Sequence, residues 1–133
     1  MPIRFPRNAE LLVPSMSELG FIVDADDPRL RIAACPGAPA CMHGHLSVRD
    51  DATRWAAKLP KGDGVILHVS GCAKGCARPA ATAATLTATA TGYDLILGAR
   101  AGDPAVRRSL SGSEVERLLA NEGARMFAVE RAS

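Results

Sequence analysis

The chain has 133 residues, of which 47% are hydrophobic, and a formal charge of +2. This length is that of one domain, residues 1–133, and lets a chain bury about 65–70% of its unfolded surface. The charges are dispersed and form no basic stripe, so nucleic acid is not an expected partner. No apolar window is long enough to cross a bilayer or to form the core of a signal peptide, and we expect a cytoplasmic protein.

The first third of the sequence predicts short elements. Residues 3–5 read as an edge strand, and Ser15 reads as the N-cap of a short helix that ends near Gly20. Residues 21–23 are expected to be extended, and the alternating segment 29–34 predicts a strand that ends at a cysteine.

The next predicted helix begins at Ser47 and ends near Leu59, because Pro60 follows. Its apolar side chains share one face: Val48, Ala52, Trp55, Ala56 and Leu59. Residues 65–69 (VILHV) form the most strand-like run and lead directly into Ser70-Gly71-Cys72.

The last third predicts a hairpin and a helix. Strands at 84–90 and 93–97 are joined by a turn at Thr91-Gly92, and residues 98–104 are a loop. Ser111 or Ser113 caps a helix that ends near Gly123, and a polar, mobile tail covers about residues 125–133. Val115, Leu118 and Leu119 face inward in this helix. These elements predict an α/β (α+β) fold with a mixed sheet and flanking helices.

All four cysteines fall into two close pairs, in CPGAPAC (Cys35, Cys41) and CAKGC (Cys72, Cys76). Two such pairs bring four soft sulfur ligands to one metal centre. Gly37 is able to take positive φ between two prolines, which gives a stiff turn. Gly71 and Gly75 argue against a regular helix around the second pair, so both pairs are expected on loops that follow strands. Lys74 would offset part of the negative charge of a thiolate-bound cluster.

Spacing alone favours an iron–sulfur cluster and leaves two alternatives open. Zinc sites usually have shorter gaps than the five residues between Cys35 and Cys41. Two disulfides would require an oxidising compartment.

The histidines indicate less. His43 and His45 are able to bind a mononuclear metal, but without a clear third ligand we interpret them as polar residues at the surface or at a helix entry. His68 lies on the predicted buried strand, where we expect a hydrogen-bonded core residue, with a role beside the cluster as the alternative.

The two cysteine motifs together resemble the 4Fe–4S half of the sulfite and nitrite reductase family. LGFIVDADDPRLRIAACPGAPAC and HVSGCAKGCARP are most similar to one branch, the precorrin-3B synthases, which hydroxylate a precorrin and form its lactone in cobalamin biosynthesis. The similarity covers about residues 11–98.

The resemblance implies an oxidoreductase with a sulfite/nitrite reductase 4Fe–4S domain-like fold. Cys35, Cys41, Cys72 and Cys76 would ligate the cluster, with Cys76 nearest to a bound tetrapyrrole, either sirohaem or a precorrin. Lys74 and Arg78 are candidates to pair with the carboxylates of this tetrapyrrole, and a solvated loop position is the alternative for both. No catalytic residue is assigned.

Full-length members of the family are several times longer, and their first half supplies much of the tetrapyrrole cradle. We therefore expect this chain to need a partner polypeptide or self-association, on an open face around Cys76. The rival hypotheses are a fragment of a sirohaem-dependent nitrite or sulfite reductase and a non-catalytic electron-transfer module.

Overall fold

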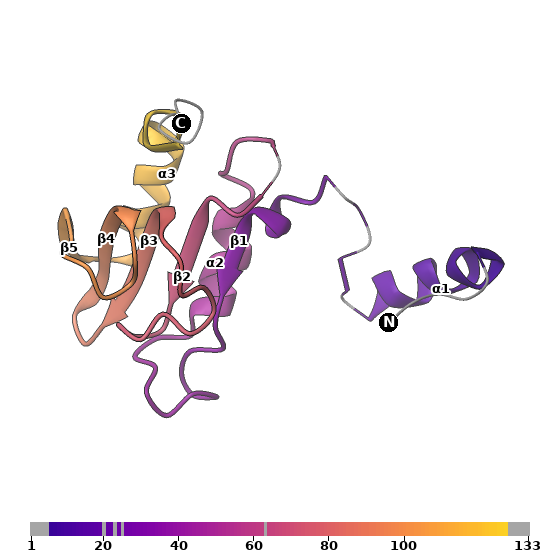
Figure 1. Ribbon diagram of the computed structural model, residues 1–133, viewed down its shortest axis with the longest axis horizontal. Helices are drawn as coiled ribbons and strands as arrows, with labels where there is room; N and C mark the ends of the chain where they lie inside the picture. The colour runs from indigo at the N-terminus through magenta and orange to yellow at the C-terminus, as the bar shows by residue number, and fades with distance from the viewer. Residues whose placement is uncertain (1–5, 20, 23, 25, 63, 128–133) are drawn as a thin grey trace.

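The computed structural model describes residues 6–19, 21–22, 24, 26–62 and 64–127. Five strands form one sheet in sequential order, as Figure 1 shows: β1 (Ile32–Ala34), β2 (Leu67–Ser70), β3 (Thr82–Thr89), β4 (Gly92–Ala99) and β5 (Arg107–Leu110). The pairs β1–β2 and β2–β3 are parallel, and the pairs β3–β4 and β4–β5 are antiparallel. The predicted α/β (α+β) fold with a mixed sheet is confirmed.

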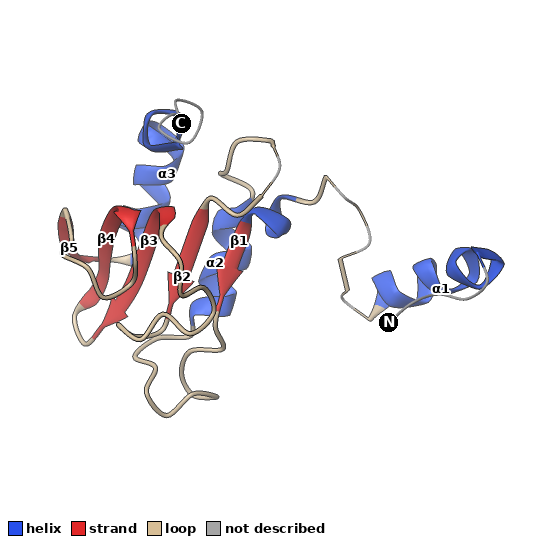
Figure 2. Cartoon of the chain, viewed as in Figure 1, coloured by secondary structure: helices blue, strands red, loops and turns tan. Residues whose placement is uncertain are grey.

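Two helices cover one face of the sheet. α2 (Val48–Ala56) connects β1 to β2 and contacts both strands, while α3 (Gly112–Phe127) follows β5 and contacts β3, β4 and β5. The opposite face has no helix in the described part of the chain, and the connection between β2 and β3 crosses it (Figure 2). α1 (Pro6–Glu18) lies apart from the sheet. No described helix has the length and apolar character needed to span a membrane.

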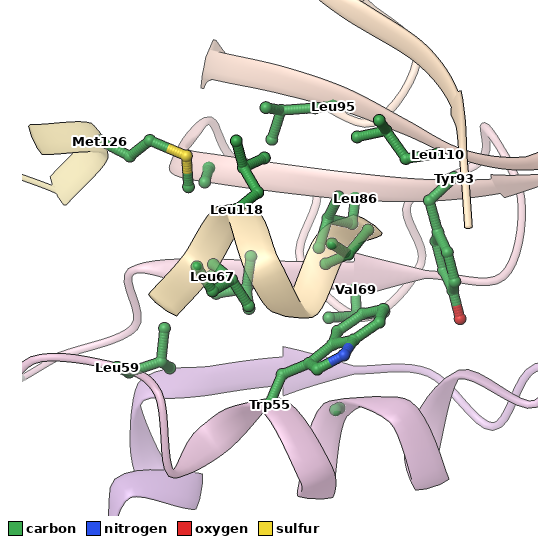
Figure 3. Packing of buried hydrophobic residues seen from close by; sticks show 14 of the residues in the cluster. Trp55, Leu59, Leu67, Val69, Leu86, Tyr93, Leu95, Leu110, Leu118 and Met126 are labelled. Carbon is green, nitrogen blue, oxygen red and sulfur yellow. The ribbon is translucent and has the colours of Figure 1, made fainter. Parts of the chain in front are cut away.

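The hydrophobic core lies between the sheet and the two helices, α2 and α3, that cover one of its faces (Figure 3). The predicted apolar faces of both helices are buried as expected: Val48, Ala52, Trp55, Ala56, Leu59, Val115, Leu118 and Leu119. Trp55 packs edge-on against Tyr93, with ring centroids 5.1 Å apart. The Tyr93 hydroxyl donates a hydrogen bond to the Asp51 carboxylate. Burial and this contact raise the pKa of Tyr93.

The predictions for the first third of the chain were partly wrong. The helix begins at Pro6 rather than after Ser15 and continues through Pro14. Proline is favourable in a first turn, and an internal proline removes one backbone hydrogen bond without always ending a helix. The segment predicted as one strand divides into a 3₁₀ turn, η1 (Pro28–Arg31), and the short β1. The Asp27 carboxylate caps η1 by accepting from the Arg29 N–H at 2.9 Å.

The positions of residues 3–5 and 23 lie outside the described residues, so the predicted edge strand has no counterpart to compare. Phe21 and Ile22 belong to neither a helix nor a strand.

The last third contains two differences from the predictions. β5 was not predicted, and it forms by pairing with β4 although its residues show no apolar alternation. α3 does not end near Gly123 but continues to Phe127, and Met126 and Phe127 are buried. The predicted mobile tail is therefore wrong for residues 125–127, since apolar burial holds them in the helix; residues 128–133 lie outside the described part.

Candidate metal centre

The two cysteine motifs follow neighbouring parallel strands. Ala34 of β1 pairs with Val69 of β2, so Cys35 and Ser70 leave the sheet at the same edge. The first motif forms a long loop beyond the ends of β1 and β2, at the bottom of Figure 1, and the second begins the connection from β2 to β3. The prediction that both pairs lie on loops that follow strands is confirmed, and the two strands are parallel neighbours.

The two loops are in direct contact. The Gly71 N–H donates to the Sγ atom of Cys35 at 3.0 Å, and the His45 N–H donates to the Gly71 carbonyl at 2.9 Å. Backbone donors of this kind stabilise a thiolate and tune the reduction potential of a cluster that it binds. One cysteine of the first pair is thus already connected to the loop of the second pair.

Three glycines make this contact possible. A β-carbon placed on Gly71 would lie 3.0 Å from the Cα of Gly37 and 3.2 Å from the Cys35 sulfur. On Gly37 it would lie 2.3 Å from the Leu46 carbonyl oxygen, and on Gly44 it would lie 2.7 Å from the Ala38 nitrogen. Gly71 therefore packs against the first loop without room for a side chain, and Gly37 and Gly44 allow the first loop to pack closely on itself.

Gly37 also gives the first loop its turn. It has φ of 67°, as the sequence predicted, and the Cys41 N–H donates to its carbonyl at 2.7 Å. Left-handed φ is costly for other residues, so this glycine fixes the path between Cys35 and Cys41.

The second loop is anchored at both ends. The Ser70 hydroxyl donates to the Cys72 carbonyl at 2.6 Å, and the Arg78 N–H donates to the Gly75 carbonyl at 3.2 Å. Gly75 has φ of 64°, and a β-carbon on it would lie 2.9 Å from the Cβ of Ala101. The loop is held close against the sheet face that no helix covers.

All four cysteines are free thiols. Cys35, Cys41 and Cys72 are half-buried and Cys76 is exposed. A reagent or ligand in solution therefore has access to Cys76 in particular.

The two predicted cations differ in their surroundings. Lys74 is exposed, whereas Arg78 is half-buried and its Nε donates to the Thr82 hydroxyl at 3.0 Å. Lys74 is available to an anionic ligand, and Arg78 already contributes to holding the end of its loop.

No three histidine, cysteine, aspartate or glutamate side chains among the described residues are grouped as a metal site. The donor set nevertheless fits an iron–sulfur cluster, because four free thiols lie on two touching loops and a backbone N–H already faces one sulfur. Metal binding often orders its ligands. Among the described residues the four sulfurs do not form one ligand group, so binding of a cluster would require movement of the two loops.

The histidines occupy two environments. His43 and His45 are exposed, and no described group of metal ligands includes them. His68 is fully buried, as its strand predicted, but neither ring nitrogen has a hydrogen-bond partner in the described structure.

Sequence reasoning did not assign a role to Gly44 or identify the contact between Gly71 and Cys35. The signal available in the sequence was the presence of small residues in both motifs. It could not show that the two loops use them against each other.

No family profile matches the chain. One curated protein, a precorrin-3B synthase from Sinorhizobium sp, is 33% identical over 110 residues, which are 80% of this chain and 24% of that protein. The two proteins are distantly related. The chain thus spans about a quarter of the length of the relative.

Proposed function

We propose that this chain is a 4Fe–4S-binding domain of an oxidoreductase related to precorrin-3B synthase, acting in cobalamin biosynthesis. The observation that carries the proposal is the hydrogen bond from Gly71 to the Cys35 sulfur, which joins the two cysteine loops at one sheet edge. The distant relationship to a precorrin-3B synthase supports the enzyme class.

Each loop has a defined part in this proposal. Cys35 and Cys41 would ligate from the first loop, and Cys72 and Cys76 from the second. The Gly71 N–H stabilises negative charge on the Cys35 sulfur, and the exposed Lys74 adds a positive charge beside the second pair. When bound, the cluster supplies single electrons.

A tetrapyrrole, either a precorrin or sirohaem, is the proposed neighbour of the cluster. The exposure of Cys76 and Lys74 supports an open face, where a flat macrocycle with anionic side groups has access. Lys74 would pair with a carboxylate, and Arg78 would do so only by sharing its contact with Thr82.

The open face also supports a requirement for a partner, since an active site surrounds its ligand and excludes water. We propose that a second polypeptide, resembling the first half of a precorrin-3B synthase, or self-association completes the site. The isolated chain is expected to bind a tetrapyrrole weakly and to show little turnover of precorrin-3A. Addition of such a polypeptide should increase both, and full turnover by the isolated monomer would contradict the requirement.

The primary experiment is anaerobic reconstitution with iron and sulfide, followed by iron and sulfide analysis and electron paramagnetic resonance. The expected product is a 4Fe–4S cluster in the wild-type chain. Cys72→Ser should abolish stable cluster binding, because a hydroxyl is a poor ligand for this soft site. The matched controls His43→Ala and His45→Ala should retain the iron content of the wild type.

Two results would contradict this assignment. Equal loss of iron in the histidine variants would show that they are ligands. Stoichiometric zinc that iron and sulfide cannot replace would indicate a structural zinc site.

The tetrapyrrole is tested separately by an absorbance titration of the reconstituted chain with sirohaem. Lys74→Glu should weaken binding, whereas Lys61→Glu should not, because exposed Lys61 precedes β2 and lies toward the opposite end of the sheet. Coupled haem and cluster spectra would favour a sirohaem-dependent reductase over a precorrin enzyme. Equal effects of both substitutions would exclude a local role for Lys74.

A further inference from the structure

His68 lies on the face of the sheet opposite the helices. Its neighbours in β2, Leu67 and Val69, belong to the core beneath α2 and α3, so the side chain of His68 points to the other side. There it pairs in register with Thr85 of β3, and its exposed fraction is 0%.

The imidazole has no hydrogen-bond partner in the part of the chain that the structure describes. Thr85 and Thr87, on the same face, donate to the carbonyls of Ala99 and Ala101. Polar groups that are fully buried are normally paired, because an unpaired one loses its hydration without compensation. Both nitrogens of this fully buried ring lack a partner. This indicates that the ring bonds to a group that is not among the described protein atoms.

The ring lies directly against the second cysteine loop. A β-carbon on Gly75 would be 3.6 Å from the Cε1 atom of His68. Cε1 stands between the two ring nitrogens, so the polar edge of the ring faces the residue that precedes Cys76. A neutral imidazole carries one N–H donor. Burial, and then the positive charge of Arg78, lower the pKa of His68, which favours this neutral form.

We infer that His68 is a positioning residue for the second cysteine loop, donating a ring N–H to a sulfur of the metal centre. The acceptor is a thiolate of Cys72 or Cys76, or an inorganic sulfide held beside them. This inference rests on the proposed function. Such a hydrogen bond would orient the loop and raise the reduction potential of the cluster, because it stabilises the more negative, reduced state.

The test compares metal-free and reconstituted protein for His68→Leu, which keeps an apolar side chain of similar size without polar atoms. In the metal-free chain the substitution should maintain or raise the melting temperature, because it removes the unpaired ring. In the reconstituted chain it should shift the midpoint potential to more negative values and accelerate the loss of iron to a chelator.

Two further variants separate positioning from structure. His68→Gln retains an N–H donor and should recover part of the potential shift. Thr85 lies in register with His68 on the same face of the sheet, and its hydroxyl donates to the Ala99 carbonyl. Thr85→Val removes this hydrogen bond and should lower the melting temperature without changing the midpoint potential.

The outcomes distinguish this inference from the proposed function. If the wild type binds a cluster and His68→Leu changes neither the midpoint potential nor the rate of iron loss, the inference fails and the proposed function stands. A metal-free His68→Leu protein less stable than the wild type would also overturn the inference, because it would reveal a structural partner of the ring. Failure of the wild type to bind a cluster would overturn both.

Discussion

Replacement of Gly71 by alanine tests whether the two cysteine loops need their close backbone contact. The new β-carbon would lie 3.0 Å from the Gly37 Cα and 3.2 Å from the Cys35 sulfur. Gly37 is itself closely packed, because a β-carbon on it would lie 2.3 Å from the Leu46 carbonyl oxygen and 2.9 Å from the Val48 nitrogen. The first loop must therefore move as a unit.

The expected cost follows from this contact. Overpacking by one methyl group in a rigid site typically costs about 1–3 kcal/mol. The weakened hydrogen bond between the Gly71 N–H and the Cys35 sulfur adds up to about 1 kcal/mol. For a domain of this size, roughly 3–6 °C of melting temperature corresponds to each kcal/mol, so we expect a decrease of about 5–15 °C.

The assay is thermal unfolding of the metal-free chain, followed by reconstitution and iron analysis. Gly71→Ala should also reduce the amount of bound cluster, because Cys35 is displaced from the second loop. Gly123→Ala is the matched control: the same methyl group is added within α3, where the nearest atoms are 4.0 Å away. Alanine is favoured over glycine in a helix by about 1 kcal/mol, so this control should be neutral or stabilising. If both variants behave alike, the loops are not packed as described and the reasoning is refuted.

Three other predictions concern the hydrophobic core and the buried His68. Tyr93→Phe keeps the edge contact with Trp55 but removes the hydrogen bond to Asp51, and should cost about 1.5–3 kcal/mol in urea unfolding. A cost near zero would mean that the hydrogen bond between Tyr93 and Asp51 does not stabilise the fold. Burial lowers the pKa of His68 below its ordinary value of 6.5, so the unfolded metal-free chain gains a proton first as the pH falls. As the pH falls below about 6.5, the free energy of unfolding should therefore decrease more in the wild type than in His68→Leu. Parallel pH profiles of the free energy of unfolding for the two proteins would contradict this. Met126→Ala should cost about 2–5 kcal/mol in urea unfolding, because the side chain is buried at the end of α3, whereas an unchanged midpoint would indicate an unstructured tail.

The sequence by itself determined the elements whose signals are local. The apolar spacing around Trp55 predicts the buried face of α2, because helical periodicity places those residues on one side. The turn after Thr89 predicts the β3–β4 hairpin, and the apolar run before Ser70 predicts β2. The four cysteines and the strand-to-loop pattern before each pair also come from local sequence.

Only the tertiary structure decided the features that depend on distant segments. β5 exists because the edge of β4 offers hydrogen-bonding groups, which Arg107–Leu110 does not encode through any apolar pattern. The length of α3 is set by burial of Met126 against the sheet rather than by the helix breaker Gly123.

The same holds for the candidate metal centre. The contact between Gly71 and the Cys35 sulfur joins residues 36 positions apart, and it arises because β1 and β2 are parallel neighbours. The unpaired ring of His68 becomes visible only when the second cysteine loop is placed over it. Local sequence specifies the candidate ligands, but the distances between them are set by strand pairing, which is a long-range property of the chain.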